Sequence, residues 1–211
     1  MREARVALAA GLVLIAVALA AVLLHSPAAV AGSNGVAAED PLGQILTRSR
    51  VCQSGEALPA GTSALVVSLS AFHGPAVSAE ALSGASVLTR GRQGSNWSGR
   101  TVTIPLRPLA RAVRDATICL AFSPGHEAVV PFGQPASPTL AAGVGGSPLP
   151  GRMRAEYLKA GDRSWWSLAS AVAYHVGLGR AAGGAWAAIL AIALGVAVTA
   201  AAAGALAAEL R

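Results

Sequence analysis

The chain has 211 residues, of which 54% are hydrophobic and 12% are charged, with a formal net charge of +6 at pH 7. An ordinary soluble domain carries about 25% charged residues, so this composition argues against a chain that meets water along its whole length. Thirteen Lys and Arg against eight Asp and Glu give the segment from Gly32 to Gly184 a balance of +5, which suits a nucleic acid, an anionic lipid or an acidic polymer.

The first predicted element is an apolar helix within residues 1–31. Val6 to Leu24 holds nineteen residues without a charge, and about 20 apolar residues suffice to cross a bilayer. Arg2 and Arg5 precede this run, which predicts that its N-terminal side stays in the cytoplasm and that the following domain is exported. The alternative is a cleaved signal peptide, because Ala29-Val30-Ala31 forms an A-x-A site; we favour retention, since the apolar run is longer than a signal requires.

A β-rich domain is predicted over residues 51–158, after an extended lead-in at residues 32–50. In ALVVSLSAF, Leu65, Val67 and Leu69 alternate with residues of the opposite face, a period that is typical of a half-buried strand. Further short strands are predicted in AVSAEAL and ASVLTR, which flank a hairpin turn at Ser83-Gly84, and in TVTIPL, TICLAF, EAVVPF and RMRAEYL. Short strands joined by Gly/Pro turns predict a mainly β, antiparallel, jelly-roll-like sandwich.

Two segments of this domain depart from the strand pattern. RPLARAVRDA, residues 107–116, is expected to form a turn or two of helix. Residues 132–150 are dense in Pro, Gly, Ala and Ser, so we expect a loose loop that buries little.

The two cysteines, Cys52 and Cys119, lie 67 positions apart without a C-x-x-C spacing, which argues against a redox motif or a zinc knuckle. In an exported domain such a pair predicts a disulfide, which would pin the first strand to a central one. Closing this loop contributes roughly 4 kcal/mol through the unfolded chain. The alternative is two buried thiols that behave as small apolar side chains.

The most site-like segment is TRGRQGSNWSGR, in which Arg90, Arg92 and Arg100 surround Trp97. An exposed tryptophan there could stack on a sugar ring. The alternative, which we prefer, is that Trp97 plugs one end of the sandwich while the arginines are solvated. No G-x-S-x-G is present and the four histidines lack metal-ligand spacing, so the sequence predicts no catalytic residue, no metal and no cofactor.

After the β domain, residues 162–180 predict an amphipathic helix with Trp165, Leu168 and Val172 on one stripe. Tryptophan and tyrosine favour the headgroup zone of a bilayer, so we expect the helix to lie on the membrane surface; a core helix under the sandwich is the alternative. A second transmembrane helix is predicted over residues 184–208, with the C-terminus in the cytoplasm. The predicted interfacial residues are Trp165, Trp166, Tyr174 and Trp186.

Three stretches, CQSGEALPAGTSAL, GSNWSGRTVTIPLRP and RMRAEYLKAGDRSWWSL, resemble uncharacterised envelope proteins of high-GC Gram-positive bacteria. The resemblance implies a jelly-roll-like domain outside the cell membrane, anchored by a C-terminal helix, in a setting of surface-glycan assembly. Its motifs are structural and transfer no catalytic residues.

These observations together predict a non-enzymatic, membrane-tethered binding or accessory module in cell-envelope glycan assembly or export. Its partners would be the lipid bilayer and either an envelope glycan or an integral membrane protein, with nucleic acid excluded by the exported location. The alternative is a structural subunit that packs its spans against a transporter or glycosyltransferase. A hydrolase is the least favoured hypothesis.

Overall fold

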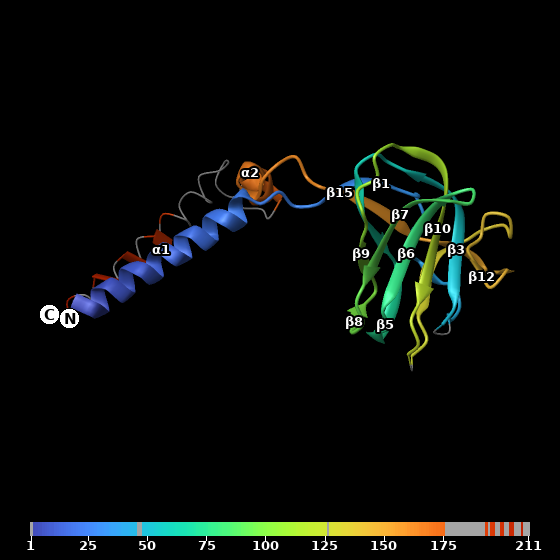
Figure 1. Cartoon of the computed structure of the whole chain (residues 1–211), viewed down its shortest axis with the longest axis horizontal. Coiled ribbons are helices and arrows are strands. Elements are labelled where there is room, and N and C mark those ends of the chain that lie inside the picture. Colours follow the sequence, from blue (N-terminus) through green and yellow to red (C-terminus); the bar gives the residue numbers. More distant parts are fainter. Residues whose placement is uncertain are drawn as a thin grey trace. The chain divides into compact units, whose positions relative to one another are not determined.

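The computed structural model describes residues 2–45, 48–125 and 127–175, and residues 193, 195–196, 199–200, 203–204 and 208 of the C-terminal segment (Figure 1). The chain divides into two compact units. One is Ala28–Ala160, and the other combines Met1–Pro27 with Gly161–Arg211. The unit Ala28–Ala160 is mainly β and its strands pair antiparallel, which confirms the predicted fold class at that level.

The largest sheet has the strand order β13-β12-β3-β10-β6-β7, and Figure 1 shows β3, β10, β6 and β7 side by side. The strands are β3 (Arg50–Leu58), β6 (Val77–Ser83), β7 (Ser86–Gln93), β10 (Val113–Phe122), β12 (Gly143–Val144) and β13 (Ser147–Pro148). β6 and β7 form the predicted hairpin, but its turn is Gly84-Ala85, one residue later than predicted, because Ser83 pairs with Ser86. The helix expected at residues 107–116 is wrong, because β10 already begins at Val113. Leu109 is buried there, and its N–H donates to the Thr62 carbonyl at 2.9 Å.

Two further sheets have the orders β1-β15-β4-β9 and β14-β11-β5-β8, with β2 paired to β11. Their strands are β1 (Ala29–Ser33), β2 (Asp40–Pro41), β4 (Thr62–Val67), β5 (Leu69–Gly74), β8 (Trp97–Gly99), β9 (Val102–Pro105), β11 (Val130–Pro135), β14 (Gly151–Met153) and β15 (Ala155–Lys159). Ser68 lies at the junction, where its N–H donates to the Arg154 carbonyl at 3.2 Å and its carbonyl accepts from Phe132 N–H at 2.9 Å. The single strand predicted in ALVVSLSAF is therefore divided into β4 and β5.

The alternating apolar residues predicted from the sequence meet in one core. Its largest fully buried apolar side chains include Leu65, Val67, Leu69, Ile104, Leu120, Met153 and Tyr157. Gly91 brings β7 close to β9, since a Cβ at this position would lie 1.7 Å from the Pro105 carbonyl oxygen. The edges of two sheets thus meet where only glycine leaves enough room.

The β unit extends beyond the predicted boundaries. Leu42 and Ile45 are each 1% exposed, while β1 pairs with β15 and β2 pairs with β11. The predicted lead-in at residues 32–50 is therefore part of the domain. The loop expected at residues 132–150 also contributes strands, because β11, β12 and β13 lie within it or overlap it. Its Ala142 is fully buried, so this segment is ordered by its contacts with the sheet, which its own composition does not indicate.

The second unit contains α1 (Arg2–Leu24) and α2 (Trp165–His175). Ser164 caps α2 through its Oγ, which accepts from Ser167 N–H at 3.3 Å, and the Trp165 N–H donates to the His25 carbonyl at 3.1 Å. Among the described residues, no helix provides a stretch that is long and apolar enough to cross a membrane. The structure therefore does not support the two flanking transmembrane helices. Most of the one predicted at residues 184–208, with Trp186, lies outside the described residues, as does the end of the amphipathic helix beyond His175.

Candidate functional site

The four residues of the predicted ligand surface do not come together. Trp97 is only 9% exposed, and its indole Nε1–H donates to the Pro75 carbonyl at 2.7 Å. The ring lies against Gly74, where a Cβ would be 2.1 Å from it. Trp97 therefore plugs the structure, in agreement with the preferred alternative, and offers no exposed face for a sugar.

The arginines of that segment separate into two places. Arg90 and Arg92 are exposed on β7. The Arg100 guanidinium lies instead over the Phe132 ring, 4.9 Å from its centroid, in a cation–π contact that fixes its position. Among the described residues, no carboxylate forms an ion pair with Arg100. Arg100 is thus a cation that the Phe132 ring holds in place and that has no carboxylate partner among the described residues.

Beside Arg100 lies an open cavity of ≈ 470 Å³, which we call the Phe72 depression. It is lined by Ser70, Ala71, Phe72, Ser98, Gly99, Arg100, Glu127, Ala128 and Val130. Phe72 is 86% exposed, which is unusual for so large an apolar side chain. The depression thus combines an exposed aromatic ring, a guanidinium and a carboxylate.

The exposed position of Phe72 results from an irregularity in strand pairing. β5 and β8 pair at Ala71 and at Gly74 but not between them. The Phe72 and His73 N–H groups donate instead to Glu127 Oε2, at 3.2 and 2.8 Å, and His73 Nδ1 lies 3.3 Å from Glu127 Oε1. The His73 backbone N–H, with smaller contributions from the His73 ring and the Phe72 N–H, lowers the pKa of Glu127 below its usual 4.5.

The depression lies far from the two points where the chain enters and leaves the β unit. Ala29 pairs with Lys159, and Lys159 pairs with Thr62 at the start of β4. Phe72 follows Thr62 by ten residues along β4 and β5, which corresponds to about 30 Å of extended chain. Figure 1 accordingly shows β5 and β8 at the opposite end of the sheets from β1 and β15.

The described contacts of the Phe72 depression reveal no arrangement of side chains for catalysis. His73 contacts Glu127, but no described hydrogen bond joins either lining serine to the His73 ring, as a Ser-His pair would require. Among the described residues, no group of His, Cys, Asp or Glu is placed to hold a metal ion. The aromatic face and the polar groups suit a ligand with an apolar face and hydroxyl groups.

A second polar cluster, which the sequence interpretation missed, lies inside the β unit. Glu56 is fully buried, and its carboxylate accepts from Gln53 Nε2 at 2.7 Å, Arg152 at 2.5 Å and the Tyr157 hydroxyl. Burial, reinforced by the Glu56 charge, raises the pKa of Tyr157 far above its usual value. Glu56 and Leu58 lie two residues apart on β3 and are both buried. The alternation of side chains along the strand could therefore have indicated that the Glu56 side chain points into the core. The cluster joins β3 to β14 and β15, with the Glu56 side chain 0% and the Arg152 side chain 19% exposed.

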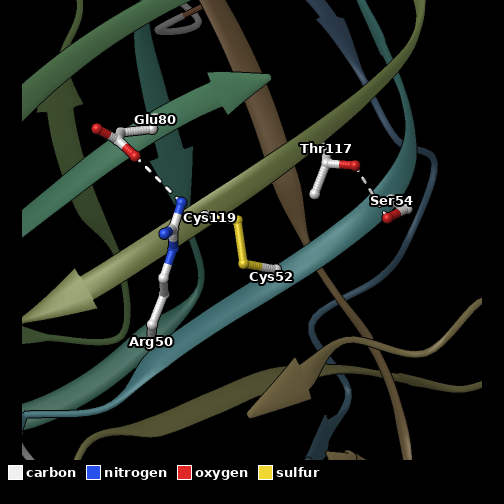
Figure 2. The surroundings of a disulfide bond; sticks show 6 residues. All are labelled: Arg50, Cys52, Ser54, Glu80, Thr117 and Cys119. Carbon is white, nitrogen blue, oxygen red and sulfur yellow. Dashed lines mark hydrogen bonds and ion pairs between the residues drawn. A yellow bond between two sulfur atoms is a disulfide. The ribbon is translucent and has the colours of Figure 1, made fainter. Parts of the chain in front are cut away.

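The predicted disulfide is present and links Cys52 to Cys119, which lies on the central β10 as expected (Figure 2). Cys52 lies on β3, a strand that the sequence interpretation did not predict. The two residues are directly paired across the strands. Their inward neighbours Val51 and Leu120 are fully buried, so the disulfide lies on the outer face of the sheet.

Three of the predicted interfacial residues are described, and their side chains are exposed. Trp165, Trp166 and Tyr174 are 42%, 62% and 58% exposed, respectively. None of them belongs to the hydrophobic core, which disfavours the alternative of a core helix.

Comparison with known proteins adds no relative: the chain matches no known protein family, no curated protein and no solved structure.

Proposed function

We propose that the chain is a non-enzymatic binding module of the cell envelope, held at the membrane, whose β unit binds a glycan in the Phe72 depression. The observation that carries this proposal is the 86% exposure of Phe72 in a hollow that also contains the unpaired Arg100. One face of a sugar ring would stack on Phe72, while its hydroxyl groups would bind the guanidinium and the Glu127 carboxylate.

Membrane tethering is supported by the side chains of α1. Val13, Leu14 and Ile15 are 62%, 70% and 59% exposed. Because they are consecutive, they point to three different sides of the helix. A helix that is apolar on all sides suits lipid better than water. The tryptophans at the start of α2 would lie in the headgroup zone, and the uncharged stretch at residues 185–208 would form the second anchor.

The proposed location is extracytoplasmic, with the C-terminus in the cytoplasm. Arg2 and Arg5 before the first apolar stretch support it, and the disulfide is typical of an oxidising compartment. The resemblance to envelope proteins of high-GC Gram-positive bacteria suggests surface glycans as the ligand class. A β unit with its depression remote from Ala28 and Ala160 would present the ligand site away from its own attachment points.

The test uses the full chain in detergent and an array of neutral and uronic-acid oligosaccharides, with binding measured by biolayer interferometry. Phe72→Ala should weaken binding at least about tenfold, because stacking contributes on the order of 1–3 kcal/mol, whereas Phe72→Tyr should retain it. Val87→Ala removes another exposed apolar side chain, 42% exposed on β7, and should have no effect.

Three outcomes would contradict the proposal. If no oligosaccharide binds, or if Phe72→Ala and the unmodified chain bind equally well, the Phe72 depression is not the ligand site. Release of the protein from membranes by carbonate washing would remove the tether. Stoichiometric recovery with an integral membrane enzyme, in the absence of glycan binding, would favour the structural-subunit alternative.

A further inference from the structure

The two cysteines of the disulfide differ in their exposure to solvent. Cys52 is partly exposed and lines an open cavity of ≈ 470 Å³, together with Arg50, Pro138, Gly143, Gly146 and Pro148. Cys119, on the neighbouring strand, is only 3% exposed. A molecule that enters this cavity therefore meets Cys52, whereas Cys119 is not among the residues that line it. This cavity, which we call the Cys52 cavity, shares no lining residue with the Phe72 depression.

We propose that Cys52–Cys119 is a thiol–disulfide exchange site, at which an external thiolate attacks Sγ of Cys52. A new S–S bond forms between the thiol and Cys52, the Cys52–Cys119 bond breaks, and Cys119 leaves as a thiolate that takes up a proton. If the attacking molecule is a dithiol, its second thiolate attacks its own sulfur in the mixed disulfide and releases Cys52. The protein disulfide is then reduced by two electrons, and the dithiol is oxidised to its disulfide.

The strands around the disulfide provide the reason why the fold can tolerate this opening. β3 and β10 are paired on both sides of it, through Val51↔Leu120 and Gln53↔Ile118. On the outer face, Arg50 pairs with Glu80 at 3.1 Å, and the hydroxyls of Ser54 and Thr117 lie 3.0 Å apart (Figure 2). The reduced cysteines would therefore stay opposite each other, ready to reoxidise.

The charges beside the disulfide act in opposite directions on this exchange. Arg50 lies two residues before Cys52 and lines the same cavity, so its guanidinium attracts the incoming thiolate. Glu80 faces Cys119 in the strand register and disfavours its release as a thiolate. Because the two side chains pair with each other, each partly cancels the effect of the other. Residues two apart on a strand lie about 7 Å from each other, so an unpaired charge at water-like screening changes the rate about threefold.

The first measurement identifies the attacked sulfur. The oxidised full chain, in detergent and without denaturant, is treated with glutathione at mildly alkaline pH, quenched by acid, and mapped by mass spectrometry. The expected product carries glutathione on Cys52 and a free thiol on Cys119. Dithiothreitol should instead give the fully reduced protein without an adduct. Adducts on Cys119, or reaction only after denaturant is added, would overturn the proposal.

The second measurement uses variants in which one cysteine is replaced by valine, an apolar residue that suits a strand. In Cys119→Val the remaining Cys52 thiol should react with a chromogenic disulfide at least about tenfold faster than the Cys119 thiol of Cys52→Val, because thiol reactivity follows exposure. Glu80→Gln should accelerate glutathione attack on the native disulfide about threefold, and Arg50→Gln should slow it by a similar factor. Equal rates for the two single-cysteine variants, with unchanged circular dichroism, would overturn the proposal.

Discussion

Removal of the buried charge of Glu56 should destabilise the β unit far more than removal of an exposed carboxylate. Glu56→Gln keeps the shape of the side chain, but it replaces one acceptor oxygen with an NH₂ donor. The fully buried carboxylate receives donors from Gln53, Arg152 and Tyr157. The new amide can direct its N–H group at the Tyr157 hydroxyl, which can accept as well as donate, so the main loss is the negative charge beside the Arg152 guanidinium.

The size of the effect follows from the burial of the pair. The Arg152 side chain is 19% exposed and that of Glu56 is 0% exposed, so the guanidinium would be left largely buried without its counter-charge. Breaking such a pair from one side costs about 3–5 kcal/mol. The matched control is Glu80→Gln, because the Arg50 and Glu80 side chains are 52% and 35% exposed. An exposed pair of this kind contributes about 1 kcal/mol or less.

Urea unfolding of the full chain in detergent, followed by far-ultraviolet circular dichroism, measures both variants. With a slope of about 1–3 kcal/mol/M, Glu56→Gln should lower the midpoint by roughly 2 M, whereas Glu80→Gln should leave it nearly unchanged. A loss below about 1 kcal/mol for Glu56→Gln, or equal losses for the two variants, would refute the assignment of Glu56 to a buried network.

Three further predictions follow from single contacts. Burial holds Tyr157 protonated in the native state, so above the usual pKa of 10.0 only the unfolded chain releases this proton. Above that pH the free energy of unfolding should therefore fall by about 1.4 kcal/mol per pH unit. Tyr157→Phe should remove this pH dependence, as measured by urea unfolding. The Glu127 carboxyl should titrate below 4.5 by NMR, so glycan binding should persist at mildly acidic pH and fail only as Glu127 becomes protonated; loss of binding well above 4.5 would contradict this. Gly74→Ala should lower the melting temperature, since its Cβ would overlap the Trp97 ring, whereas Gly94→Ala, with open space around it, should not.

The candidate site was only partly accessible from the sequence. Arg100 was predicted as part of a ligand surface, and it does border the Phe72 depression. Phe72 was missed because its position within an alternating strand gives no sign of the break in pairing between Ala71 and Gly74. Glu127 was visible beside His126, but its role depends on a contact with Phe72 and His73, which lie 55 and 54 residues away in the sequence.

The Cys52–Cys119 pairing was predicted correctly, because a chain with two cysteines leaves only one intramolecular disulfide to form. Which of the two cysteines is the more exposed could not be predicted. That depends on β12, which lies beside Cys52 in the sheet and belongs to a segment whose composition predicted a loose loop.

The sequence by itself determined the antiparallel β class, the β6–β7 hairpin to within one residue of its turn and the apolar ends of the chain, since these depend on local periodicity, turn residues and hydropathy. Tertiary structure alone decided that segments within residues 32–45 and 132–150 join the sheets and that Phe72 borders a depression together with Arg100 and Glu127. The physical reason is that burial and backbone pairing are settled by partners distant in the chain. A segment with weak preferences of its own adopts whatever structure satisfies its buried N–H and C=O groups.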